Sequence, residues 1–121
     1  MTRQEVHAAL INKLGVTLVH SEYGMTELLS QAYSKGDGIF HCPVWMKILL
    51  RDEDDPFHIM TAADSVKQPL TGLINVIDLA NIYSCSFIAT DDIGRLHANE
   101  SFEVLGRLDS SNVRGCSLMT V

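Results

Sequence analysis

The sequence lacks a basic face and a long apolar run, and each absence excludes a class of protein. It has 9 Lys and Arg residues against 15 Asp and Glu residues, a formal net charge of −6, and the basic residues are scattered. No basic stripe with interleaved aromatics is present, so nucleic acid is a poor candidate partner. No apolar run approaches the ~20 residues needed to span a bilayer. The first residues do not form a signal-peptide core, so we expect a cytoplasmic location.

Cysteine is scarce, and its placement argues against a disulfide framework and a metal site. The three cysteines, Cys42, Cys85 and Cys116, cannot all pair internally, and no Cys-x-x-Cys spacing occurs. His41 and Cys42, taken with His58 or Cys85, match no structural zinc spacing. We therefore expect free thiols in a reducing compartment.

What the sequence does contain begins as a helical pattern. Residues 4–14 carry apolar side chains at helical spacing and end at a glycine, which predicts a helix. The β-rich run at residues 16–19 predicts a buried strand, and residues 21–24 predict a loop. Thr26 is placed to cap a second helix over residues 27–33.

The rest of the chain predicts strands joined by turns. The expected strands are residues 44–50, 73–79, 84–90 and 102–105. Turn chemistry separates them at residues 34–38, 52–56, 68–72 and 91–94. We therefore expect one compact segment, residues 1–121, with an α+β fold. Its opening helix, strand and helix should lead into a β-rich antiparallel sheet or a small distorted barrel.

Three separated segments carry residues that suit a nucleotide site. They are Tyr23-Gly24-Met25-Thr26-Glu27, Thr90-Asp91-Asp92-Ile93-Gly94 and Gly106-Arg107-Leu108-Asp109. A glycine beside an aromatic ring lets a flat base approach closely, and a Thr hydroxyl with exposed amides can hold a phosphate. A glutamate supplies oxygen ligands for Mg²⁺, and an arginine fork holds phosphate or ribose oxygens. With an aspartate for the ribose hydroxyls, these groups describe half of an ATP site.

Each segment resembles a motif of the acyl-adenylate-forming enzymes, the superfamily of acyl-CoA synthetases and firefly luciferase. The first resembles the Tyr-Gly-x-Thr-Glu motif of that superfamily. The second resembles its Thr-Gly-Asp-Leu-Gly segment, with Asp91 in place of the glycine. The third resembles its Gly-Arg-x-Asp hinge segment, in which Asp109 would precede a lid domain. The resemblance implies ATP or AMP and Mg²⁺ as cofactors.

By position, the resemblance also assigns residue roles. Tyr23 would stack on adenine, Thr26 would contact the α-phosphate, and Glu27 would bind Mg²⁺. Asp92 would hold the ribose hydroxyls, and Arg107 would support the ribose or a phosphate. The cofactor-binding residues implied are Tyr23, Gly24, Thr26, Asp92 and Arg107.

A narrower resemblance concerns the acyl-protein synthetases, the ligase components of bacterial fatty-acid reductase complexes. It is carried by Ser21 to Glu27, by Ser30-Gln31-Ala32-Tyr33 and by Arg114-Gly115-Cys116-Ser117-Leu118. It implies that a fatty acid is adenylated and then passed to a cysteine, here Cys116, with an acyl reductase as partner. In that family the phosphate loop and most of the acyl pocket lie upstream. We therefore expect the carboxyl-terminal part of a ligase core, without a full lid domain.

Two alternatives remain open. One is a segment of a phenylacetate–CoA-ligase-type acyl-CoA synthetase, in which CoA accepts the acyl group. The other is a catalytically silent binding or assembly module. A sheet with exposed edges and apolar surface favours self-association, so a homo-oligomer is a further expectation.

Overall fold

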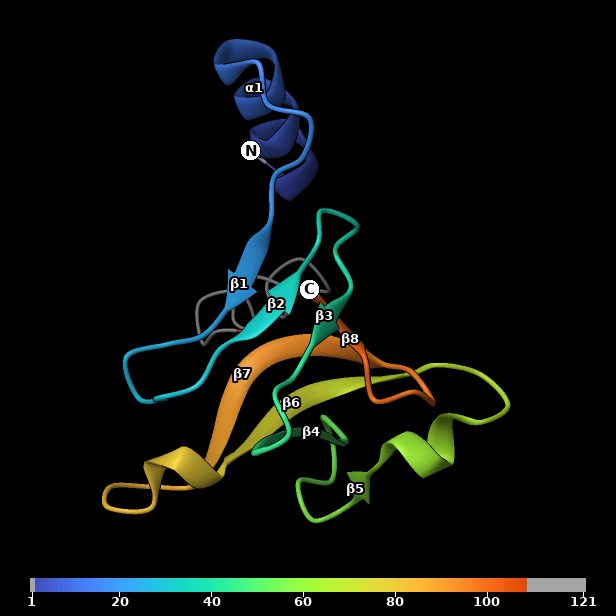
Figure 1. Cartoon of the computed structure of the whole chain (residues 1–121). Coiled ribbons are helices and arrows are strands. Elements are labelled where there is room, and N and C mark those ends of the chain that lie inside the picture. The colour runs from blue at the N-terminus through green and yellow to red at the C-terminus, as the bar shows by residue number, and fades with distance from the viewer. Residues whose placement is uncertain (1, 109–121) are drawn as a thin grey trace, which may run out of the picture.

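A computed structural model describes residues 2–108, which form one helix followed by an eight-stranded antiparallel sheet (Figure 1). The strand order is β1-β2-β3-β8-β7-β6-β4-β5, and the sheet is open, with β1 and β5 at its edges. The predicted α+β fold with a β-rich antiparallel sheet is confirmed, in its open form and not as a closed barrel. The elements are α1 (Arg3–Leu14), β1 (Ser21–Tyr23), β2 (Ala32–Ser34), β3 (Phe40–His41), β4 (Met46–Arg51), β5 (Ile59–Met60), η1 (Ala62–Ser65), β6 (Leu70–Asp78), η2 (Leu79–Asn81), β7 (Phe87–Leu96) and β8 (Phe102–Arg107).

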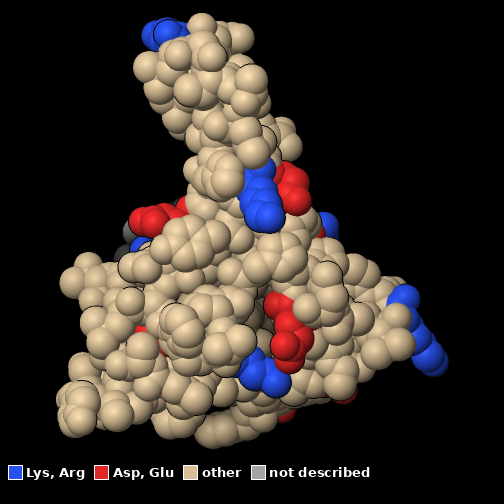
Figure 2. Space-filling view, in the orientation of Figure 1, with Lys and Arg blue, Asp and Glu red and all other residues tan. Residues whose placement is uncertain are grey.

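The first helix is set by its two caps. Thr2 and Glu5 form a capping box at its start, and Gly15 ends it in the left-handed conformation with φ 67°. The predicted helix over residues 4–14 is confirmed. None of its residues is buried, and it projects from the sheet as an arm whose surface is mostly uncharged (Figures 1 and 2). Its first two turns contact the rest of the chain: the Arg3 guanidinium lies 4.9 Å from the centroid of the Phe40 ring, and the His7 ring nitrogen Nε2 lies 2.8 Å from the Ser21 hydroxyl.

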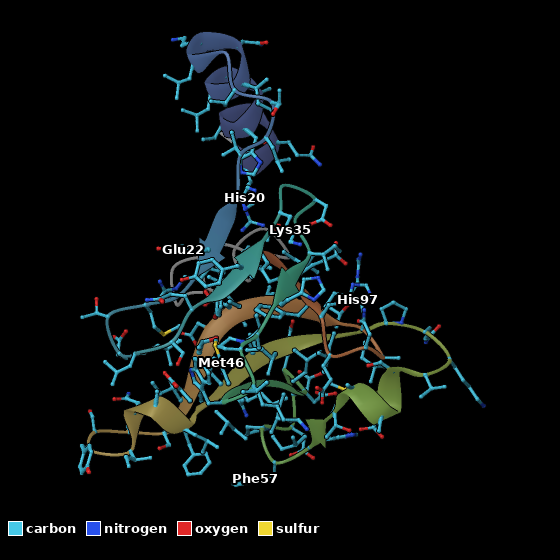
Figure 3. All side chains as sticks on the ribbon, viewed as in Figure 1. His20, Glu22, Lys35, Met46, Phe57 and His97 are labelled. Carbon is cyan, nitrogen blue, oxygen red and sulfur yellow. The ribbon has the colours of Figure 1, made fainter. Side chains whose placement is uncertain are left out.

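The core lies on one face of the long strands β4, β6, β7 and β8. Along β4 the side chains alternate between buried and more exposed positions, as expected for a strand with one covered face. Met46, labelled in Figure 3, begins this alternation and is buried. The largest fully buried side chains are Phe40, Phe102, Leu50, Ile74 and Leu96.

The prediction of a second helix over residues 27–33 is wrong. Residues 26 and 27 form a single turn, closed by a hydrogen bond from the Leu28 amide to the Met25 carbonyl. The next two amides, of Leu29 and Ser30, both donate to the carboxylate of Asp78. A carboxylate from another strand therefore takes the donors that a helix would need, and the chain then pairs as β2.

Three other predicted elements are also corrected. Residues 16–19 form no strand, because this stretch leads back from the projecting helix and lies beside no pairing partner among the described strands. The expected loop at residues 21–24 instead begins with β1, which pairs with β2. The expected turn at residues 91–94 is the middle of β7. Hydrogen bonding to β6 and β8 on both sides, with a register shift between Ile93 and Gly94, keeps that segment extended.

Candidate functional site

The three motif segments meet at one cleft of about 620 Å³. Its lining comes from the end of β1 and the turn after it, from β7, and from the last residue of β8. The lining includes Tyr23, Gly24, Glu27, Asp92 and Arg107. Five of the seven residues proposed from the sequence therefore lie together, although the chain separates them widely.

A direct hydrogen bond joins the first two segments. The Tyr23 hydroxyl donates to Oδ2 of Asp92 over 2.6 Å. The Tyr23 ring is 8% exposed and lies edge-on to Phe40 and Phe102, with ring centroids 6.2 and 5.5 Å away. Burial, together with the hydrogen bond to Asp92 and its negative charge, raises the pKa of Tyr23 well above its ordinary value. The ring is thus part of the core while its hydroxyl faces the site, and stacking on adenine stays a prediction.

The second and third segments lie on the paired neighbouring strands β7 and β8. Asp92 on β7 lies directly opposite Arg107 on β8. The Asp92 backbone amide donates to the Thr90 hydroxyl, which in turn donates to the Ile74 carbonyl over 2.8 Å. Asp92 is therefore held through its main chain as well as its side chain, while Arg107 is exposed at the end of its strand.

The turn after β1 presents the acidic residue. Glu27 is exposed and lines the cleft, whereas Thr26 is exposed in the same turn but is not among the lining residues. With Asp91 and Asp92 in the same lining, Glu27 gives the cleft three carboxylates. Carboxylate oxygens are ligands that Mg²⁺ prefers, and one or two of them suffice where nucleotide phosphates supply the others. Cys116, the proposed acyl acceptor, lies outside the described residues.

Asp78 and Asn81 anchor this turn, and the sequence analysis missed both. Asp78 is fully buried and accepts hydrogen bonds from the amides of Leu29, Ser30 and Ala80 and from the Ser30 hydroxyl. Asn81 Nδ2 donates to the Glu27 carbonyl over 2.7 Å and to the Cys85 carbonyl over 2.9 Å. An acidic residue at the end of an apolar run is the signal that could have identified Asp78.

Opposing effects set the ionisation of Asp78. Burial acts to raise its pKa, but the hydrogen bonds from the Ser30 hydroxyl and from the amides of Ser30, Leu29 and Ala80 outweigh it. The pKa of Asp78 therefore lies below its ordinary value, and the carboxylate stays charged. The Ser30 hydroxyl also accepts a 2.8 Å hydrogen bond from Nε1 of Trp45, which extends the network to the residue directly before β4.

The position where the resembled motif has glycine is filled by an ion-paired residue. Asp91 lies 3.9 Å from Nη2 of Arg51, and the same guanidinium donates to the Thr90 carbonyl and to Oδ1 of Asn75. This arginine thus links β4, β6 and β7. Asp91 has no left-handed backbone conformation, so the strand accepts a residue with a side chain there.

The free cysteines and the other possible metal ligands offer little further chemistry. Cys42 and Cys85 are free thiols, and burial raises the pKa of Cys42 to about 11. Among residues 2–108 no three His, Cys, Asp or Glu side chains are grouped closely enough to hold a metal ion by themselves. In the same residues no helix is long and apolar enough to cross a membrane. An ion at Glu27 would therefore need ligands from a bound nucleotide.

Comparison of the sequence with known proteins identifies no family and no curated relative. No protein-family model matches this chain, and a search of the curated proteins also finds no match. The function is therefore inferred from the cleft and from the residues that line it.

Proposed function

We propose that this chain forms the adenylate-facing part of an ATP-dependent acyl ligase. The whole ligase would activate a carboxylic acid, a fatty acid in the resembled family, as an acyl-adenylate and pass the acyl group to a thiol. One observation carries the proposal: the hydrogen bond from Tyr23 to Asp92 joins two motif segments in a cleft that the third also lines. Chance motifs would have no reason to share one cleft.

The charges around the cleft suit the ribose and phosphate of a nucleotide. The hydrogen bond from Tyr23 fixes the direction of the Asp92 carboxylate, which can accept from ribose hydroxyls. Arg107 stands on the opposite strand position, where its planar fork suits phosphate or ribose oxygens. Asp92 and Arg107 are cross-strand neighbours, so a ribose bound over them could contact both the carboxylate and the guanidinium.

Glu27 is the residue that would hold Mg²⁺ beside the phosphates. Its carboxylate is exposed at the cleft, and Mg²⁺ is commonly held by one or two carboxylates together with nucleotide phosphates. When bound, Mg²⁺ neutralises phosphate charge and so favours attack by a carboxylate on the α-phosphate. Glu27 itself would supply one negatively charged oxygen ligand to the ion beside the phosphates.

The acceptor thiol distinguishes the two ligase readings. If Cys116 accepts the acyl group, Cys116→Ser abolishes covalent acyl labelling of the chain in the complete ligase, and an acyl reductase is the expected partner. If CoA is the acceptor, as in the phenylacetate–CoA-ligase type, the same substitution leaves turnover unchanged. The raised pKa of Cys42 makes that thiol a poor nucleophile in either case.

Nucleotide binding to the chain itself tests the proposal. We expect AMP to bind weakly, with a dissociation constant on the order of 1 mM, because in this proposal the chain supplies only part of the nucleotide site. Amide chemical-shift changes should be confined to residues lining the cleft, and Asp92→Ala should remove them. Shift changes scattered over the surface, or unchanged binding in Asp92→Ala, would contradict the assignment.

Glu22 provides a matched control for the metal site. Glu22 and Glu27 are both exposed glutamates of the same segment, but only Glu27 lines the cleft, and Glu22 lies on β1 (Figure 3). Glu27→Gln should weaken binding of MgATP, whereas Glu22→Gln should not. Equal losses in both variants would indicate a general effect of negative charge and would remove the metal role from Glu27.

A silent binding or assembly module is the second candidate function. Exposed apolar side chains gather in the connection between β6 and β7 and beside it, and they include Leu29, Leu79, Ile82, Tyr83 and Phe87. The outer edges of β1 and β5 also have no partner strand within the described residues. Concentration-dependent self-association without any response to AMP would favour this module, including a homo-oligomer formed through the sheet edges.

A further inference from the structure

The connection between β6 and β7 reaches across to the turn that carries Glu27. Asp78 is the last residue of β6 and Asn81 is the last of η2, so both belong to one short connection. Their partners, Glu27, Leu29 and Ser30, all lie in the segment between β1 and β2. About fifty residues separate the two sides, so these contacts are purely tertiary.

The contacts are more numerous than the capping of η2 requires. One hydrogen bond, from the Ala80 amide to Oδ1 of Asp78, serves that local purpose. The other three donors to Asp78, and the donation from Asn81 to the Glu27 carbonyl, serve only the distant segment. A fully buried carboxylate is costly unless several donors satisfy it, so removing these donors would not be neutral.

We propose that Asp78 and Asn81 are positioning residues that clamp the Glu27 turn in the geometry needed for metal-assisted nucleotide binding. In this clamp Asn81 holds the Glu27 carbonyl, and Asp78 holds the amides of Leu29 and Ser30 that follow the turn. The Glu27 carboxylate is thereby left exposed on a main chain that is fixed before any ligand arrives. This inference rests on the proposed function for its metal role, while the clamp itself can be measured without a nucleotide.

Hydrogen exchange of the full chain tests the clamp directly. In Asn81→Ala the amides of Leu28, Leu29 and Ser30 should exchange faster by about tenfold or more, since the turn can then open locally. Amides within β6 and β7 should keep their protection. Unchanged exchange in the turn would overturn the clamp. An equal rise throughout the sheet would also overturn it, because it would show only general destabilisation.

The metal role is tested by comparing two nucleotides. Binding of AMP depends on the ribose side of the cleft, whereas binding of MgATP depends in addition on Glu27. We expect Asn81→Ala to weaken MgATP binding about tenfold, as for residues that orient metal ligands, and to leave AMP binding nearly unchanged. Equal losses for both nucleotides, or none, would overturn the positioning role.

Asp64→Asn is the matched control for Asp78→Asn. Asp64 caps η1 by accepting from the Thr61 amide and hydroxyl, and η1 lies at the opposite end of the sheet from η2 (Figure 1). Asp64→Asn should leave both nucleotide affinities and the exchange of the Glu27 turn unchanged, whereas Asp78→Asn should weaken MgATP binding and speed exchange in the Glu27 turn. If the wild-type chain binds neither nucleotide, the proposed function fails for this chain, and the exchange measurement still decides the clamp.

Discussion

The Tyr23 hydroxyl and the Asp92 carboxylate are joined by a 2.6 Å hydrogen bond across 69 positions of sequence. The bond connects the end of the short edge strand β1 to the middle of β7, one of the two longest strands. The donor lies in an aromatic cluster, and the acceptor lines the cleft. The same contact therefore contributes to the fold and orients a proposed ribose ligand.

Tyr23→Phe should test both parts of that contact. The ring and its two aromatic neighbours are retained, so the loss of free energy of unfolding should be ~1.5 kcal/mol, as for a hydrogen bond to a charged acceptor. Urea unfolding at pH 8 measures it. No loss in Tyr23→Phe would show that the hydrogen bond to Asp92 contributes nothing to stability.

The pH dependence of Tyr23 gives a second prediction. Its folded-state pKa is raised, so its contribution to stability is complete below the unfolded value of about 10 and is lost as pH rises toward the folded value. Wild-type protein should therefore lose more stability than Tyr23→Phe between pH 9 and pH 11. Parallel curves for the two proteins would mean that Tyr23 is not protected from ionisation.

Asp78→Asn should be among the most damaging polar substitutions. It converts a fully buried acceptor of four hydrogen bonds into a group that also donates, so we expect a loss of roughly 3 kcal/mol at pH 7. The folded pKa of Asp78 is depressed, so its contribution is present above the ordinary value of about 3.8 and disappears as pH falls through the folded value. The difference between wild type and variant should shrink below pH 4.

The parts of the fold that the sequence predicted are those fixed by local chemistry. The first helix followed from apolar spacing and a glycine stop, and it is present with both caps. The strands now labelled β4, β6 and β8 followed from β-rich runs, although β6 begins at Leu70, inside the turn expected at residues 68–72. In each case neighbouring residues carry the information, so no distant contact was needed to predict the element.

The parts that failed depend on distant residues. The helix expected after Thr26 is absent because Asp78, from another strand, binds the amides of Leu29 and Ser30. The turn expected at residues 91–94 is absent because two neighbouring strands hold it in the sheet. The grouping of site residues was predicted only through resemblance, since no periodicity places Tyr23 beside Asp92.

In the hairpin between β7 and β8, replacing Glu100 with glycine should stabilise the protein. Glu100 has φ 68°, the one non-glycine positive φ among the described residues, in a turn closed by the pairing of His97 with Ser101. Its ion pair with Lys47, at 3.3 Å, is exposed and therefore weak. Glu100→Gly should raise the free energy of unfolding by ~0.5 kcal/mol, because relief of the backbone conformation exceeds the lost ion pair.

Glu100→Ala is the control for that prediction. It removes the same ion pair but keeps a Cβ in the left-handed conformation, so thermal unfolding should show it less stable than Glu100→Gly. If alanine and glycine give the same melting temperature, the backbone conformation at Glu100 costs nothing and the prediction is contradicted.

Two motif glycines, Gly94 and Gly106, should respond in opposite ways to alanine. A Cβ on Gly94 would lie 2.6 Å from Cδ1 and Cγ1 of Ile74 and 3.2 Å from the Glu103 carbonyl, while a Cβ on Gly106 would meet nothing within 4 Å. Gly94→Ala must displace a fully buried core side chain, so we expect a loss of about 2 kcal/mol in urea unfolding. Gly106→Ala should be nearly neutral for stability, because neither space nor a positive φ demands glycine there. A large loss in Gly106→Ala would contradict the packing of β8, whereas reduced AMP binding with unchanged stability would place Gly106 at the nucleotide.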